Sequence, residues 1–274
     1  MLEQLVYINH QNERFEFGRD GIYVDTNQLR NYEWKYNKRN NRITSLYHDI
    51  AKFKLPVKFI CKSDDLTTAA KNALYEVTEK DVLANQPGKI VIGDYYMRGF
   101  VTKSEKKNYL TSQRYAQYNL TITSDYPYWL REYKYKFSAG GAEKGGQNLD
   151  YAFDFPYDYK SDMGVTTFAS RSVWDSNFRI VIYGVCTDPE IRISGHLYKI
   201  LGDIGANEYL TIDSVSKEIY LTTNIGNKVN RFNDRYRKSY IFEKIPGGTV
   251  NVLWDGSFAF DLYIMDERSE PKWS

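Results

Sequence analysis

The sequence predicts a mainly β protein with one helix, and three observations support that prediction. The chain of 274 residues contains 25 Tyr and 14 Phe, which favour the pleated, half-buried surface of a sheet. Apolar and polar residues alternate with period two in many short segments, as in strands that bury one face. Helical spacing of apolar residues occurs in one segment, residues 64–86. The length favours two domains, with one long all-β domain as the alternative.

The first predicted elements are strands. Residues 5–8 and 15–24 alternate on either side of the polar segment 10–14, which is typical of a hairpin. A further strand is predicted at residues 32–36, and a basic, polar loop is predicted after it at residues 37–42. The chain therefore begins as sheet.

A strand at residues 52–61 leads into the predicted helix at residues 64–86. Ser63 or Asp64 can cap its first turn, because both side chains accept hydrogen bonds from free backbone amides. Pro87 ends it, because proline does not continue a helix. The apolar residues that recur at helical spacing are Leu66, Ala69, Ala70, Ala73, Leu74 and Val77.

A hairpin and one more strand complete the first half. Residues 89–102 are predicted to form a hairpin that turns at Gly93 and Asp94, and residues 115–123 alternate again. The polar, basic segment 103–114 between them is predicted to be a long exposed turn.

The sharpest change in composition lies at residues 138–149, where four glycines stand among small and polar neighbours. Such a sequence does not hold a regular element and is typical of a flexible linker. We therefore expect a first domain at residues 1–136, a second domain at residues 137–274, and a linker at residues 137–149.

After the linker, short strand-like segments recur with turn residues between them, which predicts an antiparallel β-sandwich. Glycines supply most of the turns, as in the pair Gly247 and Gly248. The predicted strands are residues 178–185, 190–193, 196–200, 209–213, 218–222, 250–254 and 257–265.

Composition argues against nucleic acid and membranes as partners. The chain has 37 Lys and Arg against 35 Asp and Glu, which is too balanced for a protein that binds polyanions or reads a nucleic-acid sequence. The first residues carry charges where a signal peptide needs an apolar run, and no segment reaches the length of a membrane span. We expect a soluble protein that is made in a cytoplasm.

No catalytic, metal or cofactor site is predicted. Cys61 and Cys186 lie far apart in apolar segments, where a thiol packs as an apolar side chain, so a disulfide and a metal site are both weak interpretations. His10, His48 and His196 are the only histidines, and none is spaced to join a cysteine in a zinc site. His196 also lacks a nucleophile elbow beside it.

The many carboxylates leave a glycosidase as a weak alternative function. Glycoside hydrolysis needs two acidic side chains on facing elements, and the sequence does not show which elements face each other. The glycines at 140–141 and 145–146 lack the lysine and the following helix of a phosphate-binding loop, so no nucleotide cofactor is expected. The acidic candidates are Asp150, Asp154, Asp158, Asp203, Asp213, Asp255 and Asp261.

The basic, aromatic stretch at residues 30–42 fits either a solvated loop or a subunit interface. Nucleic acid ranks last as its partner, because the charge of the whole chain is balanced. Aromatic residues and arginine are enriched at the energetic centres of protein contacts. If the stretch is an interface, its predicted contact residues are Trp34, Tyr36, Arg39 and Arg42.

Six phrases stand out by their order and spacing: 124–129 (SDYPYW), 189–195 (PEIRISG), 207–213 (NEYLTID), 230–232 (NRF), 242–248 (FEKIPGG) and 267–273 (ERSEPKW). Together they resemble the distal tail protein family of long, non-contractile-tailed phages and prophages of Gram-positive bacteria. The likeness covers nearly the whole chain, since the predicted helix and its flanking hairpins match the family's first domain. No single phrase is diagnostic, and the ordered set carries the resemblance.

The resemblance implies a first domain with the tail-tube fold, a β-sandwich flanked by one helix, and a second, galectin-like antiparallel β-sandwich. It implies a homo-hexameric ring that acts as the structural hub of the baseplate, at the distal end of the tail in the virion. The implied partners are the tail tube protein, the tail-associated lysin or tail fibre protein and, in some phages, a receptor-binding protein. On this interpretation the chain serves host adsorption and is not an enzyme.

An extended hairpin is one way to embrace a neighbouring subunit in such a ring. Residues 31–44 are favoured over residues 101–115 for this role, because Trp34 and Tyr36 can serve as anchors. The phrase 267–273 could pack on the first domain or stay with the second.

A galectin-like fold also raises an alternative function, a carbohydrate-binding module that attaches to host cell-wall polysaccharide. A fold does not carry its function, so a sugar site must be argued from residues. Trp174, in the loop-like segment 172–177, is the best candidate for an aromatic platform, whereas Trp254 is predicted to pack in the core or in a hairpin.

Overall fold

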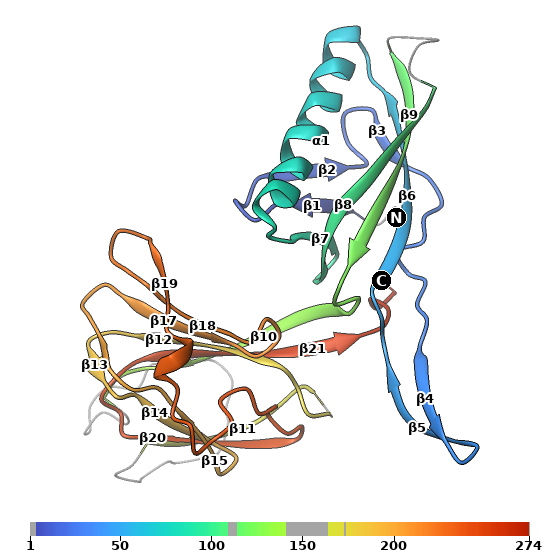
Figure 1. Cartoon of the computed structure of the whole chain (residues 1–274). Helices are drawn as coiled ribbons and strands as arrows, with labels where there is room; N and C mark the ends of the chain where they lie inside the picture. The colour runs from blue at the N-terminus through green and yellow to red at the C-terminus, as the bar shows by residue number, and fades with distance from the viewer. Residues whose placement is uncertain (1–3, 109–113, 141–163, 173, 274) are drawn as a thin grey trace, which may run out of the picture. The chain divides into compact units, whose positions relative to one another are not determined.

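The computed structural model describes residues 4–108, 114–140, 164–172 and 174–273, and its secondary structure is mostly strand with one α-helix. The mainly β prediction is therefore confirmed. The chain divides into two compact units (Figure 1). The first comprises Met1–Arg131 together with Glu267–Ser274, and the second comprises Glu132–Asp266.

Both hairpins predicted for the first unit occur, but the strand predicted at residues 15–24 is divided into a strand at residues 14–17 and a separate strand at residues 22–24. Strand β1 (Leu5–Ile8) pairs antiparallel with β2 (Arg14–Phe17). On its other side β1 pairs with β7 (Gly88–Ile92), which turns at Gly93 into β8 (Tyr95–Asn108). Gly93 adopts a φ of 58°, a conformation that glycine reaches without steric cost.

Strand β8 is long enough to make two pairings. After it leaves β7 it pairs with β9 (Tyr115–Ser124), which pairs along its length with β6 (Ala51–Ile60), and β6 pairs with β3 (Ile22–Val24). The turn predicted at residues 103–114 was wrong for residues 103–108, which continue β8. The side chains of residues 103–107 are exposed, so the sequence shows no alternation there, although the backbone continues to pair with β9. Residues 109–113 lie outside the described part of the chain.

Helix α1 (Asp64–Ala84) confirms the one predicted helix. Ser63 caps it, since its Oγ accepts a hydrogen bond from the backbone amide of Leu66 at 3.3 Å. Asn85 ends the helix in the left-handed conformation, and its amide donates to two carbonyls of the last turn. The helix lies beside strands β1 and β2 in Figure 1.

One hydrophobic core fills the first unit. Alternate residues of β6 point into it, which confirms the period-two pattern of residues 52–61, and α1 adds residues from one face. Its members include Tyr7, Phe53, Leu55, Val57, Phe59, Leu74, Val77, Ile90, Met97, Leu120, Ile122 and Trp129.

Between β3 and β6 the chain forms a separate hairpin of β4 (Lys35–Arg39) and β5 (Arg42–Tyr47), which extends away from the sheets of this unit (Figure 1). The strand predicted at residues 32–36 and the loop predicted at residues 37–42 were wrong in their positions. The turn is the pair Asn40 and Asn41, whose φ angles are 49° and 60°. Asparagine tolerates positive φ, which two-residue hairpin turns require.

In the second unit two antiparallel sheets contribute to one core. One follows the order β19-β18-β17-β12-β21-β10, and the other follows the order β11-β20-β14-β15. The first contains β10 (Trp129–Phe137), β12 (Phe178–Tyr183), β17 (Tyr209–Asp213), β18 (Glu218–Thr222), β19 (Lys228–Asn230) and β21 (Phe260–Arg268). The second contains β11 (Gly164–Ala169), β14 (Glu190–Ile193), β15 (His196–Lys199) and β20 (Thr249–Trp254).

All seven strands predicted for the second half occur, although the last begins at Phe260. Strands β10, β11 and β19 were not predicted, and neither were the short pair β13 (Cys186–Thr187) and β16 (Asp203–Ile204) and the 3-10 turn η1 (Phe232–Asp234). Trp254 is buried in the core, as predicted. Of the linker predicted at residues 137–149, Phe137 ends β10 in the core, and residues 141–149 lie outside the described part.

Candidate functional site

The hairpin β4–β5 is the most unusual surface of the first unit, because every residue of both strands is exposed. An isolated two-stranded ribbon is only marginally stable in water, since it has no core of its own. A hairpin of this length is therefore expected to rest on another surface.

One face of this hairpin is apolar. Tyr36 lies opposite Leu46, and Lys38 lies opposite Ile43 across a bulge, so these four side chains point to the same side. Tyr36, Leu46 and Ile43 are 57%, 57% and 60% exposed. We call these three residues the apolar face of the hairpin.

The tip of the hairpin is cationic. Arg39 and Arg42 lie directly opposite each other beside the turn, where like charges repel. Within the described ranges, neither arginine forms an ion pair. A carboxylate supplied by a partner would relieve this repulsion, and a bidentate pair with arginine is among the stronger polar contacts.

The base of the hairpin is held by an aromatic cluster. The ring of Trp34 lies 4.0 Å from that of His48, and the His48 ring lies 4.7 Å from that of Tyr128, measured between centroids. The Nδ1 atom of His48 is 2.8 Å from the carbonyl oxygen of Glu33, and its Nε2 atom is 3.2 Å from Ser269 Oγ. Trp34 therefore fixes the start of the hairpin and keeps 41% of its surface exposed.

The last described residues pack against the same region, which answers the question that the sequence left open for the phrase 267–273. The guanidinium of Arg30 donates to the backbone oxygen of Pro271 at 2.7 Å and to the carboxylate of Glu270 at 3.3 Å. Its carbon atom Cζ lies 3.7 Å from the centroid of the Trp273 ring. These contacts agree with the place of Glu267–Ser274 in the first unit.

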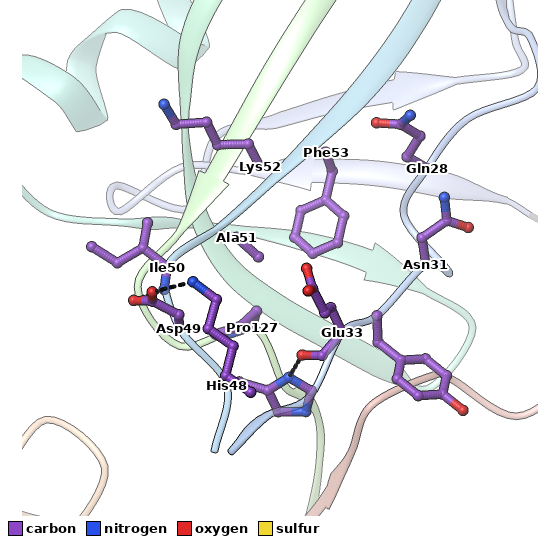
Figure 2. Close-up of a pocket in the computed structure, with 12 residues that line it drawn as sticks. Gln28, Asn31, Glu33, His48, Asp49, Ile50, Ala51, Lys52, Phe53 and Pro127 are labelled. Atoms are coloured by element: carbon purple, nitrogen blue, oxygen red, sulfur yellow. Dashed lines mark hydrogen bonds and ion pairs between the residues drawn. The ribbon is translucent and has the colours of Figure 1, made fainter. Parts of the chain in front are cut away.

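A pocket of about 390 Å³ lies at the base of the hairpin (Figure 2). Polar side chains, among them Glu33, His48 and Asp49, line it together with Phe53. Lys35 forms an ion pair with Asp49 at 2.7 Å, and their hydrogen bond raises the pKa of Lys35 and lowers the pKa of Asp49. Because both groups are exposed, this pair contributes little to stability.

A second apolar surface of the first unit is the groove beside α1, with a volume of about 410 Å³. Tyr75 and Val82 of the helix are 60% and 46% exposed, and they line the groove together with Val101 of β8 and Tyr118 of β9. Charged side chains of both signs also line the groove: Lys71, Lys103, Lys106 and Glu79.

Trp174, the predicted sugar platform, lies in the second unit and is 77% exposed. Its backbone amide donates to Ser172 Oγ at 3.3 Å, and Ser176 Oγ donates to its carbonyl oxygen at 3.0 Å. These contacts hold the backbone of Trp174 and leave its indole ring exposed to solvent. None of the four predicted interface residues lies in this unit.

The acidic candidates for catalysis that the structure describes have structural partners. Asp261 pairs with Lys134 at 2.7 Å, and Asp203 accepts from Thr187 Oγ1 at 2.6 Å. Asp213 and Asp255 accept from backbone amides in their own turns. Three further candidates lie outside the described residues; they are Asp150, Asp154 and Asp158.

The remaining candidates for chemistry also have ordinary surroundings. The Nε2 atom of His196 is 2.9 Å from the carbonyl oxygen of Tyr240. Cys61 and Cys186 are buried and unpaired, and burial raises the pKa of the Cys186 thiol to about 11. The described ranges hold no group of three His, Cys, Asp or Glu side chains placed to bind a metal ion. Within the same ranges, no helix is both long and apolar enough to cross a membrane.

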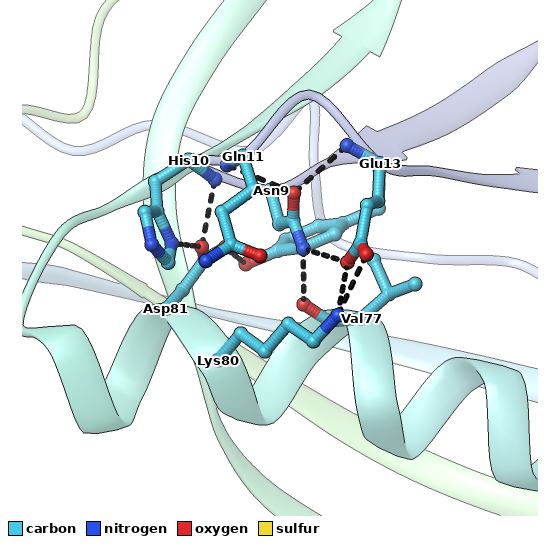
Figure 3. Close-up of polar contacts among 8 residues, drawn as sticks. Asn9, His10, Gln11, Glu13, Val77, Lys80 and Asp81 are labelled. Atoms are coloured by element: carbon cyan, nitrogen blue, oxygen red, sulfur yellow. Dashed lines mark hydrogen bonds and ion pairs between the residues drawn. The ribbon is translucent and has the colours of Figure 1, made fainter. Parts of the chain in front are cut away.

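The sequence prediction missed a buried polar network between the first turn and α1 (Figure 3). Asp81 is fully buried and accepts from Tyr7 Oη at 2.6 Å and from the amide of His10 at 2.8 Å, and its Oδ1 lies 2.6 Å from His10 Nδ1. Burial and the Asp81 carboxylate raise the pKa of Tyr7, so its hydroxyl stays protonated and donates.

The same network ties the turn between β1 and β2 to the helix. Asn9 donates to the backbone oxygen of Val77 at 3.2 Å, and Lys80 forms an ion pair with Glu13 at 2.6 Å. The one feature of the sequence that could have indicated this network is Asp81, an acidic residue on the same helical face as the buried Val77. Both carboxylate oxygens of Asp81 thus have hydrogen-bond partners from β1 and the turn that follows it.

Comparisons with protein-family models and with curated proteins find no match. Among solved structures, the chain is similar to Dit of phage SPP1, described as a paradigm of the hub adsorption apparatus of phages that infect Gram-positive bacteria, with a TM-score of 0.55 and 8% identity. That match covers 98% of this chain and 100% of the Dit chain.

Two structures of the phage P2 baseplate in its activated conformation are similar as well. The structure with calcium has a TM-score of 0.66, and the structure with strontium has a TM-score of 0.65; both matches show 11% identity over 99% of this chain and 100% of theirs. At these identities the likeness establishes a shared fold over nearly the full length.

Proposed function

We propose that this protein belongs to the distal tail protein family and is the structural hub of a phage tail tip, where it assembles into a homo-hexameric ring. The observation that carries the proposal is the hairpin β4–β5, a fully exposed ribbon with an apolar face and a cationic tip. Such a surface fits docking onto another subunit better than it fits solvent. The shared fold with SPP1 Dit and the P2 baseplate chains supports the same assignment.

In this proposal the ring joins the tail tube to a tail-associated lysin or tail fibre protein and, where present, to a receptor-binding protein. Its place is the distal end of the tail in the virion, and its role is structural and not enzymatic. The first domain, predicted at residues 1–136 and joined in the structure by Glu267–Ser274, has in this proposal the tail-tube type of fold and forms the ring. The second, residues 137–274, is a galectin-like β-sandwich.

A cyclic ring repeats one heterologous interface, so each chain needs two different surfaces that fit each other. We assign the hairpin β4–β5 to one side, with Tyr36 at its centre and Arg39 and Arg42 at its tip. The groove beside α1, lined by Tyr75 and Val82, offers the other exposed apolar surface of the same unit.

The assembly state of the full chain tests this proposal. We expect light scattering over a range of concentrations to give a mass six times the 32.1 kDa of one chain, and electron micrographs of that fraction to show closed rings. A monomer at every concentration, or an open filament, would contradict the proposed ring.

A second candidate function is the carbohydrate-binding module, and the exposure of Trp174 favours it. We expect Trp174→Ala to weaken binding to purified cell-wall polysaccharide at least about tenfold, because a central aromatic contact contributes about 2 kcal/mol or more. The matched control is Trp273→Ala, which removes an equally exposed indole from the first unit. Absence of binding by the unsubstituted protein would remove this candidate.

A further inference from the structure

The second unit contains a pocket that no part of the proposed hub function uses. Its volume is about 460 Å³, within the usual size range of small-molecule sites. Residues 235–242 form most of its wall, and Lys217, in the turn between β17 and β18, contributes from a distant part of the sequence. Phe232 and Phe242 supply an aromatic floor, with ring centroids 6.1 Å apart and planes inclined by 21°.

The charge of this pocket is strongly positive. Lys217, Arg235, Arg237 and Lys238 line it, and no carboxylate does so. Within the described ranges, none of these four side chains forms an ion pair. Residues 228–244 contain six Lys and Arg and two Asp and Glu, a net charge of +4, whereas the net charge of the whole chain is +2. The nearly neutral net charge of the whole chain therefore hides a local cationic site.

Two features of the pocket suit it to a ligand with a ring as well as a negative charge. The Arg235 guanidinium is preorganised, because it stacks 3.9 Å from the Phe232 centroid and donates to the Phe232 carbonyl oxygen at 2.6 Å. Tyr240 lines the pocket with a ring that is 52% exposed. An exposed aromatic ring offers a flat apolar surface beside the cations, as sites that orient a small polar ligand do.

We propose that this pocket binds an anionic saccharide, a sugar ring that carries a phosphate or a carboxylate group. Arg235, Arg237, Lys238 and Lys217 bind the charged group, and Tyr240 packs against the ring. A bare inorganic anion would bind the cations without contacting Tyr240, and a nucleic-acid chain would need a basic groove that continues beyond one pocket. The proposal depends neither on ring assembly nor on Trp174.

The test is calorimetric titration of the full chain at low ionic strength with glucose 6-phosphate, glucuronate, glucose and inorganic phosphate. We expect one of the two anionic sugars, or both, to bind, and to bind more tightly than glucose or inorganic phosphate. The two anionic probes distinguish a phosphate site from a carboxylate site. Binding of neither one, or equal binding of glucose, would overturn the proposal.

Variants locate the site. Arg237→Glu is expected to weaken binding of the anionic sugar at least about tenfold, because it replaces a charge-assisted contact by repulsion. The matched control Lys228→Glu makes the same change of charge in the same basic segment, outside the pocket, and is expected to change affinity by less than about twofold. Equal losses in both variants would show a diffuse charge effect and contradict a site.

A third variant tests the role of the ring. Tyr240→Ala is expected to weaken binding of the anionic sugar and to leave the affinity for inorganic phosphate unchanged. His196 contacts the backbone oxygen of Tyr240, so this substitution keeps that contact. Tighter binding of single-stranded oligothymidine than of either sugar, at equal ionic strength, would assign the pocket to nucleic acid and overturn the saccharide proposal.

Discussion

Replacement of Tyr36 or Leu46 by Asp is expected to abolish self-association of the full chain. Each substitution puts a carboxylate at the centre of the apolar face of the hairpin, where assembly would bury it without a partner. We expect the dissociation constant to rise at least about a hundredfold, which corresponds to about 2.7 kcal/mol. Light scattering of the purified variants measures this change.

The matched control for these variants is Ile225→Asp. Ile225 is 77% exposed and lies in a turn of the second unit, so the same charge is added at an apolar position outside the hairpin. This control is expected to assemble as the unsubstituted chain does. All three variants should keep the circular dichroism of the folded protein, since each changes an exposed side chain. Normal assembly of Tyr36→Asp and Leu46→Asp would exclude the hairpin as an interface.

Asp81→Ala is expected to lower the free energy of unfolding of the first unit by about 3 kcal/mol. The substitution leaves the buried hydroxyl of Tyr7 and the backbone amide of His10 without their acceptor. Urea denaturation followed by the helical circular dichroism signal measures the effect, because α1 is the one α-helix of the described residues and lies in this unit.

The control for this prediction is Glu76→Ala in the same helix. Glu76 is exposed, so its removal is expected to change the free energy of unfolding by less than about 0.5 kcal/mol. Similar changes for the two variants would mean that the network around Asp81 contributes no more than a surface carboxylate, and would refute its structural role.

The sequence predicts well those elements whose side chains alternate between core and solvent. Residues 52–61 and the strands of the second half have such patterns, and α1 has both helical spacing and a cap at Ser63. The period-two pattern arises only where one face of a strand is buried, however. A strand with both faces exposed shows no such pattern. The hairpin β4–β5 and the end of β8 are of this kind. The residue pattern predicted a strand at 32–36, a loop at 37–42 and a turn at 103–114, whereas an extended hairpin at residues 31–44 was predicted only with the help of the family resemblance.

Contacts between residues far apart in the chain were the second feature that the sequence did not predict. His10 and Asp81 stand 71 positions apart, and Arg30 and Glu270 stand 240 positions apart, with the whole second unit between them in the sequence. Propensity and spacing describe neighbours along the chain, and they do not place such pairs. The pocket around Arg235 was not predicted for another reason. The balanced charge of the whole chain hides a local excess of positive charge.

The candidate interface residues lie in one hairpin, yet the structure gives them different surroundings. Trp34 packs at the base against His48, Tyr36 lies on the apolar face, and Arg39 and Arg42 face each other at the tip. The sequence selected the segment by its aromatic and basic content. It did not reveal Ile43 and Leu46, which complete the apolar face, because their alternation with Tyr36 depends on a bulge in the register.

The most direct test of the central proposal is photo-crosslinking from position 46. A photoreactive amino acid replaces Leu46 in an isotopically heavy chain, which is mixed with an unsubstituted light chain, assembled, irradiated and analysed by mass spectrometry of its peptides. The proposed ring predicts crosslinks that join heavy peptides containing position 46 to light peptides of a neighbouring chain. Crosslinks confined to peptides of the same heavy chain would place the hairpin on its own subunit and contradict the proposal.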